Sequence, residues 1–281
     1  MANQYKIKKI MNNNVVLAED LSNNREAVLV GKGLGFGKKT NAIVSISKEA
    51  IEKMFITYDE SLKNDYFKLI DSIDETIIET CSDIILKAEG VLGQLNSRIH
   101  VVLTDHISFA LERLEMGLDI ENPFLDEIKA LYPKEYELGV YARKRFKKKL
   151  GIDIGQGELG FIALHLNAAK QNKEVKEALR DTRLIKELVS IIEESLDYTI
   201  EKSINYNRLM DHLKGCIHRV KTGTTVENPL IDILKSEFQE SFAIALKIKE
   251  KLDEALEVEI PIGELGYLTI HINRIKKTKN T

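Results

Sequence analysis

The sequence predicts a multidomain protein in which a small antiparallel β domain is followed by two homologous all-α helical bundles. Residues 105–167 reappear 106 positions later at 211–273 without a gap, and 17 of the 63 aligned positions are identical. Glycines and β-branched runs dominate the N-terminal part, whereas apolar residues recur at helical spacing from residue 66 onward. A repeat held at one fixed offset indicates a duplicated domain.

The N-terminal part is predicted to form a four-stranded antiparallel unit. Two β-branched runs flank a polar turn at 20–24, the signal of a hairpin. A further strand is expected at 42–47, and 49–56 is expected to be a brief helix or turn. Four glycines within 31–37 exclude both helix and regular strand. Because so small a sheet is marginal alone, we expect it to dimerise.

The remainder is predicted to be helical. Apolar residues step by three or four from Phe67 to Val91, which indicates a long amphipathic helix. The other expected helices are 103–116, 124–131, 134–150 and 158–169 in the first copy, and a segment around 184–192, 209–221, 229–237, 239–256 and 264–277 in the second. We therefore predict domains at 1–60, 66–171 and 172–281.

Composition limits the compartment and the partners. The net charge of −3 does not by itself predict nucleic acid, but residues 1–40 carry seven Lys or Arg against three Asp or Glu. No apolar run is long enough for a membrane span, and the first residues lack the apolar segment of a signal peptide. We expect a cytoplasmic protein without membrane insertion.

The glycine-rich segment Gly31–Gly37 matches neither the dinucleotide-binding motif nor a phosphate-binding Walker loop. Glycines allow close approach of the backbone to a partner, neighbouring lysines supply phosphate contacts, Phe36 offers a stacking surface, and the asparagines at 12–14 offer groups that read base edges. This combination favours RNA. The alternative is a glycine-rich turn beside a solvated basic face.

Four of the six histidines occupy repeat-equivalent positions, and each pair is 59 residues apart. A single helix histidine is most often a packed interior residue, but a packing role alone would tolerate replacement in one copy. Zinc is disfavoured because the ligand set is thin, and acid–base catalysis because Asp105 and His106 are adjacent on one helix and do not face each other. Phosphorylation of a ring nitrogen remains, which adds a charge of about −1.5 to −2.

The basic run 143–149 suggests a second nucleic-acid patch. It precedes Gly151, where cations complement the end of a helix dipole, and the second copy is less basic there. We favour a solvated helix end.

Motifs in all three predicted domains resemble one known family. The segments Lys9–Val15 and Gly31–Lys39, the motif around Asp105-His106 and the motif ending in His165 occur in the order seen in the transcriptional antiterminators that regulate sugar phosphotransferase operons. The second copy carries Asp211-His212 and His271 in the same places. The resemblance covers essentially the whole chain and is strongest to the glucose-type branch; the β-glucoside and sucrose branches are alternatives.

The resemblance implies a non-enzymatic antiterminator with a co-antiterminator RNA-binding domain, two phosphotransferase regulation domains and no cofactor or metal. Its partners would be an RNA hairpin in nascent mRNA, a second copy of the chain, the phosphocarrier protein and a sugar permease. The implied RNA contacts are Lys9, Asn12, Asn14, Gly31, Lys32, Gly33 and Phe36. The implied phosphoacceptors are His106, His165, His212 and His271.

Two other functions remain possible at this point. A DNA-binding activator with the same regulation domains would require a helix-turn-helix at the N-terminus, where glycine-rich hairpins are predicted instead. A histidine-dependent metallohydrolase would require bound metal.

Overall fold

A computed structural model describes residues 2–10, 13–23, 25–51, 53–56, 73–224 and 226–279. Contacts group the chain into two compact units. Unit 1 is Met1–Glu121 with Glu137–Asn172, and unit 2 is Asn122–Tyr136 with Lys173–Thr281. The domain boundaries expected from the sequence stay a prediction.

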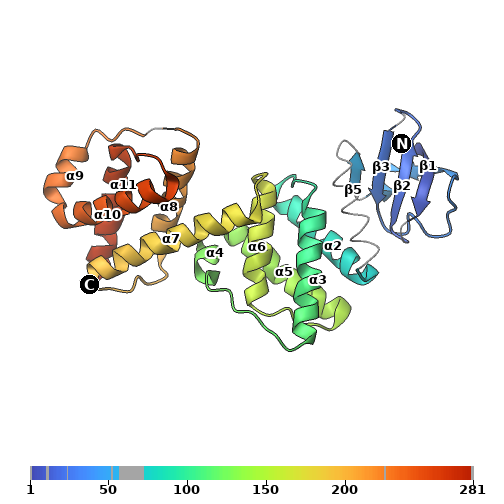
Figure 1. Cartoon of the computed structure of the whole chain (residues 1–281), viewed down its shortest axis with the longest axis horizontal. Coiled ribbons are helices and arrows are strands. Elements are labelled where there is room, and N and C mark those ends of the chain that lie inside the picture. Colours follow the sequence, from blue (N-terminus) through green and yellow to red (C-terminus); the bar gives the residue numbers. More distant parts are fainter. Residues whose placement is uncertain are drawn as a thin grey trace. The chain divides into compact units, whose positions relative to one another are not determined.

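Unit 1 begins with an antiparallel sheet in the order β4-β1-β2-β3-β5 (Figure 1). Its strands are β1 (Ala2–Ile10), β2 (Val15–Asp20), β3 (Arg25–Val30), β4 (Ile43–Ser47) and β5 (Lys53–Ile56). The predicted hairpin is confirmed: β2 pairs with β3, and the Asp20 carboxylate accepts a hydrogen bond of 2.9 Å from the Ser22 backbone in the turn. The expectation of four strands and of helix or turn throughout 49–56 is wrong. Only Lys48–Ala50 is a 3-10 turn, and 53–56 adds a fifth strand at the edge beside β3.

The two faces of the sheet bury different side chains because residues alternate along each strand. Val16 and Leu29 belong to a core closed by Leu34 from the glycine-rich loop. Val15 and Val30 face the other side, where they pack with Ile78 of helix α2. Both faces are therefore covered within unit 1.

The helices follow the predicted periodicity closely. In the first copy they are α2 (Glu75–Leu92), α3 (Ile99–Glu115), α4 (Leu125–Leu131), α5 (Pro133–Leu150) and α6 (Gly157–Lys170). In the second they are α7 (Val175–Leu196), α8 (Ile204–Lys221), α9 (Ile231–Glu237), α10 (Gln239–Leu256) and α11 (Ile262–Lys279). Each predicted helix is confirmed, except that the first begins only at Glu75: Ile73 and Asp74 precede it, and the expected helical residues before 73 lie outside the described ranges.

Helices α4 and α9 occupy equivalent places in the sequence repeat but pack differently. Helix α9 contacts α10 and α11 of its own copy, whereas α4 contacts α7 and α8 within unit 2. Lys186 on α7 donates a hydrogen bond of 2.6 Å to the carbonyl of Pro123, and Lys214 on α8 donates one of 2.8 Å to the carbonyl of Leu131. The two equivalent helices of the duplicated sequence thus pack against different neighbours.

The repeated Gly-Glu-Leu-Gly motif has a packing reason in the second copy. A Cβ atom on Gly263 would lie 2.0 Å from the carbonyl oxygen of Val226, so only glycine fits.

Gly263→Ala is expected to destabilise the fold by about 1–3 kcal/mol, the range for overpacking. Gly90→Ala in α2 is the control, because nothing lies near its added Cβ and the change is expected to stabilise by about 0.4–1 kcal/mol. Urea unfolding measures both; equal midpoints would contradict this explanation of the motif.

Candidate functional site

The glycine-rich loop and the asparagine turn before β2 are joined by hydrogen bonds. The backbone N–H of Gly31 donates to the Asn14 carbonyl at 2.9 Å, and that of Gly35 donates to the Asn13 carbonyl at 2.8 Å. The Gly33 N–H donates to the side-chain oxygen of Asn14 at 2.7 Å. Gly33 has φ +72°, a left-handed conformation that favours glycine. Two segments joined by bonds between residues 17 to 22 apart along the chain therefore form one surface.

This surface presents several of the side chains predicted to contact RNA. Lys9, Lys32 and Gly33 are exposed, and Phe36 is 73% exposed although it is a large apolar residue. An exposed aromatic ring in a loop that also carries an exposed lysine suits base stacking combined with phosphate contact. Asn12 lies outside the described residues.

Gly31 differs from the other predicted contacts because it is buried. A Cβ atom at this position would lie 2.1 Å from the carbonyl oxygen of Ala50. Close packing inside the β domain therefore explains why position 31 is a glycine. Contact between Gly31 and RNA stays a prediction.

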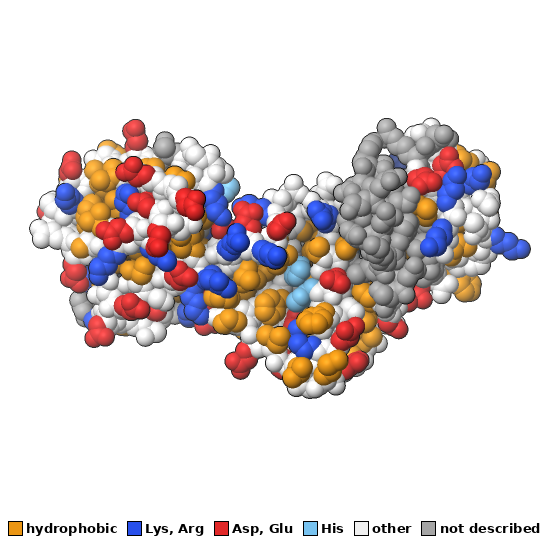
Figure 2. Space-filling model, in the orientation of Figure 1, with side chains coloured by type: hydrophobic (Ala, Val, Ile, Leu, Met, Phe, Trp, Pro, Cys, Tyr) orange, Lys and Arg blue, Asp and Glu red, His pale blue; other side chains and the backbone are white. Residues whose placement is uncertain are grey.

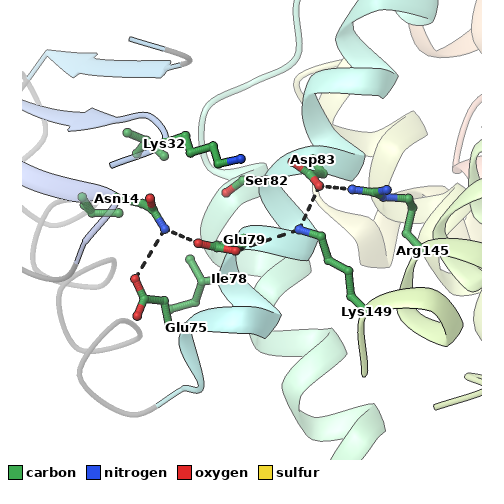
Figure 3. A pocket seen from close by; sticks show the side chains of 11 residues that line it. Asn14, Lys32, Glu75, Ile78, Glu79, Ser82, Asp83, Arg145 and Lys149 are labelled. Atoms are coloured by element: carbon green, nitrogen blue, oxygen red, sulfur yellow. Dashed lines mark hydrogen bonds and ion pairs between the residues drawn. The ribbon is translucent and has the colours of Figure 1, made fainter. Parts of the chain in front are cut away.

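The side-chain amide of Asn14 faces acidic residues of α2 in a pocket (Figure 3). It donates a hydrogen bond of 3.4 Å to Glu75 and another to Glu79, two residues one helical turn apart. Lys32 lines the same pocket, and Lys149 lies 4.0 Å from Glu79. RNA that contacts the Asn14 amide must therefore replace these carboxylates.

The basic run at the end of α5 is engaged by acidic side chains. Arg143 bonds Asp153 at 2.5 Å, Arg145 bonds Asp83, and Lys149 lies 3.0 Å from Asp83. These ion pairs favour the interpretation of the basic run as a solvated helix end over its interpretation as a second nucleic-acid patch.

The first pair of histidines, His106 on α3 and His165 on α6, lie close together with their rings tilted. The rings of His106 and His165 have centroids 4.7 Å apart. His106 Nε2 is 2.8 Å from one carboxylate oxygen of Glu158, and Arg113 lies 2.5 Å from the other. Glu158 is 1% exposed, whereas the His106 side chain is 20% exposed. Histidine side chains are visible at the surface of unit 1 (Figure 2). The cluster is thus a buried ion pair that holds a reachable imidazole.

The second copy contains the equivalent residues in a different arrangement. The rings of His212 and His271 have centroids 4.9 Å apart, on α8 and α11. Arg219 binds both oxygens of Glu264, at 2.6 and 2.8 Å. His212 Nε2 lies 3.7 Å from Glu264, which is too far for a hydrogen bond. This nitrogen is buried and has no hydrogen-bond partner.

Sequence reasoning matched the four histidines but assigned no role to the glutamate and arginine of each cluster. The signal was present in the repeat: Glu158 and Glu264 are 106 apart, as are Arg113 and Arg219. Asp105, which precedes His106 in the sequence, is exposed. Within the described parts of the chain, no three His, Cys, Asp or Glu side chains are arranged to hold a metal ion.

Burial favours the neutral form of His165, His212 and His271. It lowers the pKa of His165 to about 3, with His106 acting in the same direction. Burial also lowers the pKa of His212 to about 4; His271 and Arg219 act in the same direction and Glu264 opposes them. The pKa of His271 is lowered by burial and by Arg274. A neutral imidazole has a lone pair available for a nucleophilic step.

These shifts predict a loss of stability in mild acid. The pKa values of His165 and His212 lie below the unfolded value of about 6.5, so the unfolded chain binds more protons between that pH and about pH 4. Stability is fully present above pH 6.5 and falls below it, by about 1.4 kcal/mol per histidine at pH 5.5. Urea unfolding at pH 7.5 and 5.5 measures this. His165→Asn should reduce the difference, exposed His218→Asn should not, and equal stability of the native chain at both pH values would contradict it.

Comparisons with known proteins identify two domain families in this chain. The CAT RNA binding domain family matches residues 5–64, and the PRD domain family matches 82–169 and 186–275. The transcription antiterminator LicT of Bacillus subtilis is 35% identical, with 97% of this chain and 99% of that protein aligned. The PtsGHI operon antiterminator of the same species is 36% identical over 98% of each chain.

Two further similarities extend this group. The GlcA/glcB genes antiterminator of Staphylococcus carnosus is 34% identical over 99% of this chain and 98% of that protein. A crystal structure of GlcT CAT-PRDI superposes with a TM-score of 0.55 and 39% identity, covering 60% of this chain and 99% of that one.

An RNA-binding domain followed by two regulation domains defines a regulatory protein and not an enzyme. The chain belongs to the family of transcription antiterminators that combine a CAT RNA-binding domain with two PRD domains. The resemblance seen in the sequence is confirmed, and a β-sheet stands where a DNA-binding activator would need a helix-turn-helix. No helix in the described ranges is both long and apolar enough to span a bilayer.

Proposed function

We propose that this antiterminator acts in the cytoplasm as a homodimer that grips a hairpin in nascent mRNA and so prevents an overlapping terminator from forming. The observation that carries the RNA part is the set of hydrogen bonds that joins the asparagine turn to the glycine-rich loop, in which both Phe36 and Lys32 are exposed. The proposed RNA contacts are Lys9, Asn12, Asn14, Gly31, Lys32, Gly33 and Phe36.

The second part of the proposal is control by phosphorylation at His106, His165, His212 and His271. The donors are the phosphocarrier protein and a sugar permease of the phosphotransferase system, as in the family resemblance. Its support is the paired arrangement of imidazoles in both copies. A phosphoryl group of about −1.5 to −2 charge beside a partner subunit's equivalent site would repel that subunit.

An apolar surface beside the first cluster supports subunit contact there. Phe109 lies one helical turn after His106 and is 63% exposed, and Met116 and Leu118 are 75% and 56% exposed. The equivalent residues of the second copy are Gly215, Thr222 and Thr224. Exposed apolar side chains gathered in one copy mark an interaction surface.

Transcription of a template with an antiterminator hairpin overlapping a terminator tests the function. The purified full chain should raise readthrough, and a mutated hairpin should abolish the increase. Prior incubation with the phosphorylated phosphocarrier and permease should change readthrough in the native chain but not in a variant with all four paired histidines replaced. Readthrough that ignores the hairpin sequence would reject the proposal.

A further inference from the structure

The two clusters use the same four residue types with different partners. In the first, the Glu158 carboxylate is shared between His106 Nε2, at 2.8 Å, and Arg113, at 2.5 Å. In the second, Arg219 takes both oxygens of Glu264, and His212 is left without a hydrogen bond to it. The copies therefore hold their first histidines differently.

The contact with Glu158 determines which nitrogen of His106 carries the proton. An ionised carboxylate only accepts hydrogen bonds, so the ring nitrogen 2.8 Å from it is the protonated one. A neutral imidazole protonated at Nε2 has its lone pair at Nδ1. Nε2 also has no space for a phosphoryl group unless Glu158 moves away. Both arguments leave Nδ1 as the nucleophilic atom.

We propose that Glu158 is a positioning residue that makes Nδ1 of His106 the phosphoryl acceptor and stabilises the ring once it is phosphorylated. The inference rests on the proposed function, in which His106 receives a phosphoryl group from a protein phosphohistidine. The Nδ1 lone pair attacks phosphorus and a new N–P bond forms as the donor's P–N bond breaks. The bonding pair returns to the donor imidazole, which leaves neutral because its other nitrogen keeps its proton.

The product explains why a carboxylate is useful here. His106 becomes a phosphorylated imidazolium whose proton stays on Nε2, where it is hydrogen-bonded to Glu158. A hydrogen bond between two charged groups is stronger than one between neutral groups, so the carboxylate favours the product. Arg113 balances the charge of Glu158 before transfer.

His212 lacks this assistance in the second copy. Its Nε2 is buried without a partner, and both oxygens of Glu264 are bound to Arg219. The two copies are thus expected to differ in the speed of transfer to their first histidine, with His106 the faster acceptor.

The full chain with Glu158→Gln tests the role directly. A glutamine has one acceptor oxygen, which Arg113 retains, so its NH2 group faces His106 Nε2 and shifts the ring proton to Nδ1. Nitrogen-15 chemical shifts of labelled histidines should show His106 protonated at Nε2 in the native chain and at Nδ1 in the variant. Transfer to His106 from the phosphorylated phosphocarrier and permease, followed by peptide mapping at alkaline pH, should slow by at least about tenfold.

Two comparisons separate this effect from general damage. Glu112 is exposed and lies on α3, the helix that carries His106, and Glu112→Gln should leave labelling of His106 unchanged. Glu264→Gln should slow labelling of His212 less than Glu158→Gln slows labelling of His106. The isomer of phosphohistidine at His106 in the native chain, read with isomer-selective antibodies, should be the Nδ1 form, and this measurement needs no variant.

Phosphate on Nε2 of His106, or an unchanged transfer rate in a folded Glu158→Gln variant, would overturn the inference. Absence of any label on His106 in the native chain is a different result, because it would reject the proposed phosphorylation itself.

Discussion

Replacing His106, His165, His212 and His271 by alanine is expected to abolish transfer of acid-labile phosphate to the full chain. These imidazoles form two closely spaced pairs, and burial lowers the pKa of His165, His212 and His271, which favours the neutral form that a phosphoryl acceptor requires. The purified phosphocarrier and a panel of permease domains supply radiolabelled phosphate, and acid-labile label on the protein is counted.

Variants in which one of the four histidines is replaced at a time then show how much label each copy carries. His218→Ala is the matched control, because His218 is exposed and has no counterpart in the repeat, so its variant should keep all the label. Label that persists in the fourfold variant would show that the acceptors are other residues. The permease domain that labels the native chain also identifies the sugar to which the protein responds.

Phe36→Ala is expected to weaken binding of the full chain to an RNA hairpin with two internal loops by about 1–3 kcal/mol, roughly 5- to 150-fold, the measured range for loss of a stacking aromatic. The ring is 73% exposed, so its removal should not damage the core of the β domain. Fluorescence anisotropy at several salt concentrations provides the affinities.

Ile233→Ala is the control for this loss, since it removes a large apolar side chain that is 58% exposed and lies outside the proposed RNA and subunit surfaces. Lys32→Ala should lower the salt dependence of binding by about one phosphate contact. Glu79→Gln should act in the opposite direction and strengthen binding, because it weakens the acidic pair that holds the Asn14 amide. Equal affinities of the Phe36 and Ile233 variants would contradict the assignment of Phe36 as a stacking residue.

The helices were predictable because their determinants are local. Apolar residues at intervals of three or four mark the buried face, and Pro133 and Gly151 mark the two ends of α5 closely. The fifth strand was missed because 53–56 is short and follows a 3-10 turn. Its strand state depends on pairing with β3, about 26 residues earlier in the chain.

The candidate sites were predictable in part. The repeat identified the paired histidines, and the composition of the glycine-rich loop pointed to RNA. The packing role of Gly31 was not visible, because the carbonyl of Ala50 that excludes a side chain comes from a distant turn. The roles of Glu158 and Glu264 were also missed, because their arginine partners lie 45 residues away on another helix.

The sequence by itself determined the duplication, the order of a β domain and two helical copies, and the identity of the matched histidines, because repeats and periodicity are properties of the chain alone. Only the tertiary structure decided that α4 packs on α7 and α8, and that Glu158 bonds His106 while Glu264 is taken by Arg219. The distance from imidazole to carboxylate is 2.8 Å in the first copy and 3.7 Å in the second, and this difference of less than 1 Å separates a hydrogen bond from none. Such distances are set by how the helices pack.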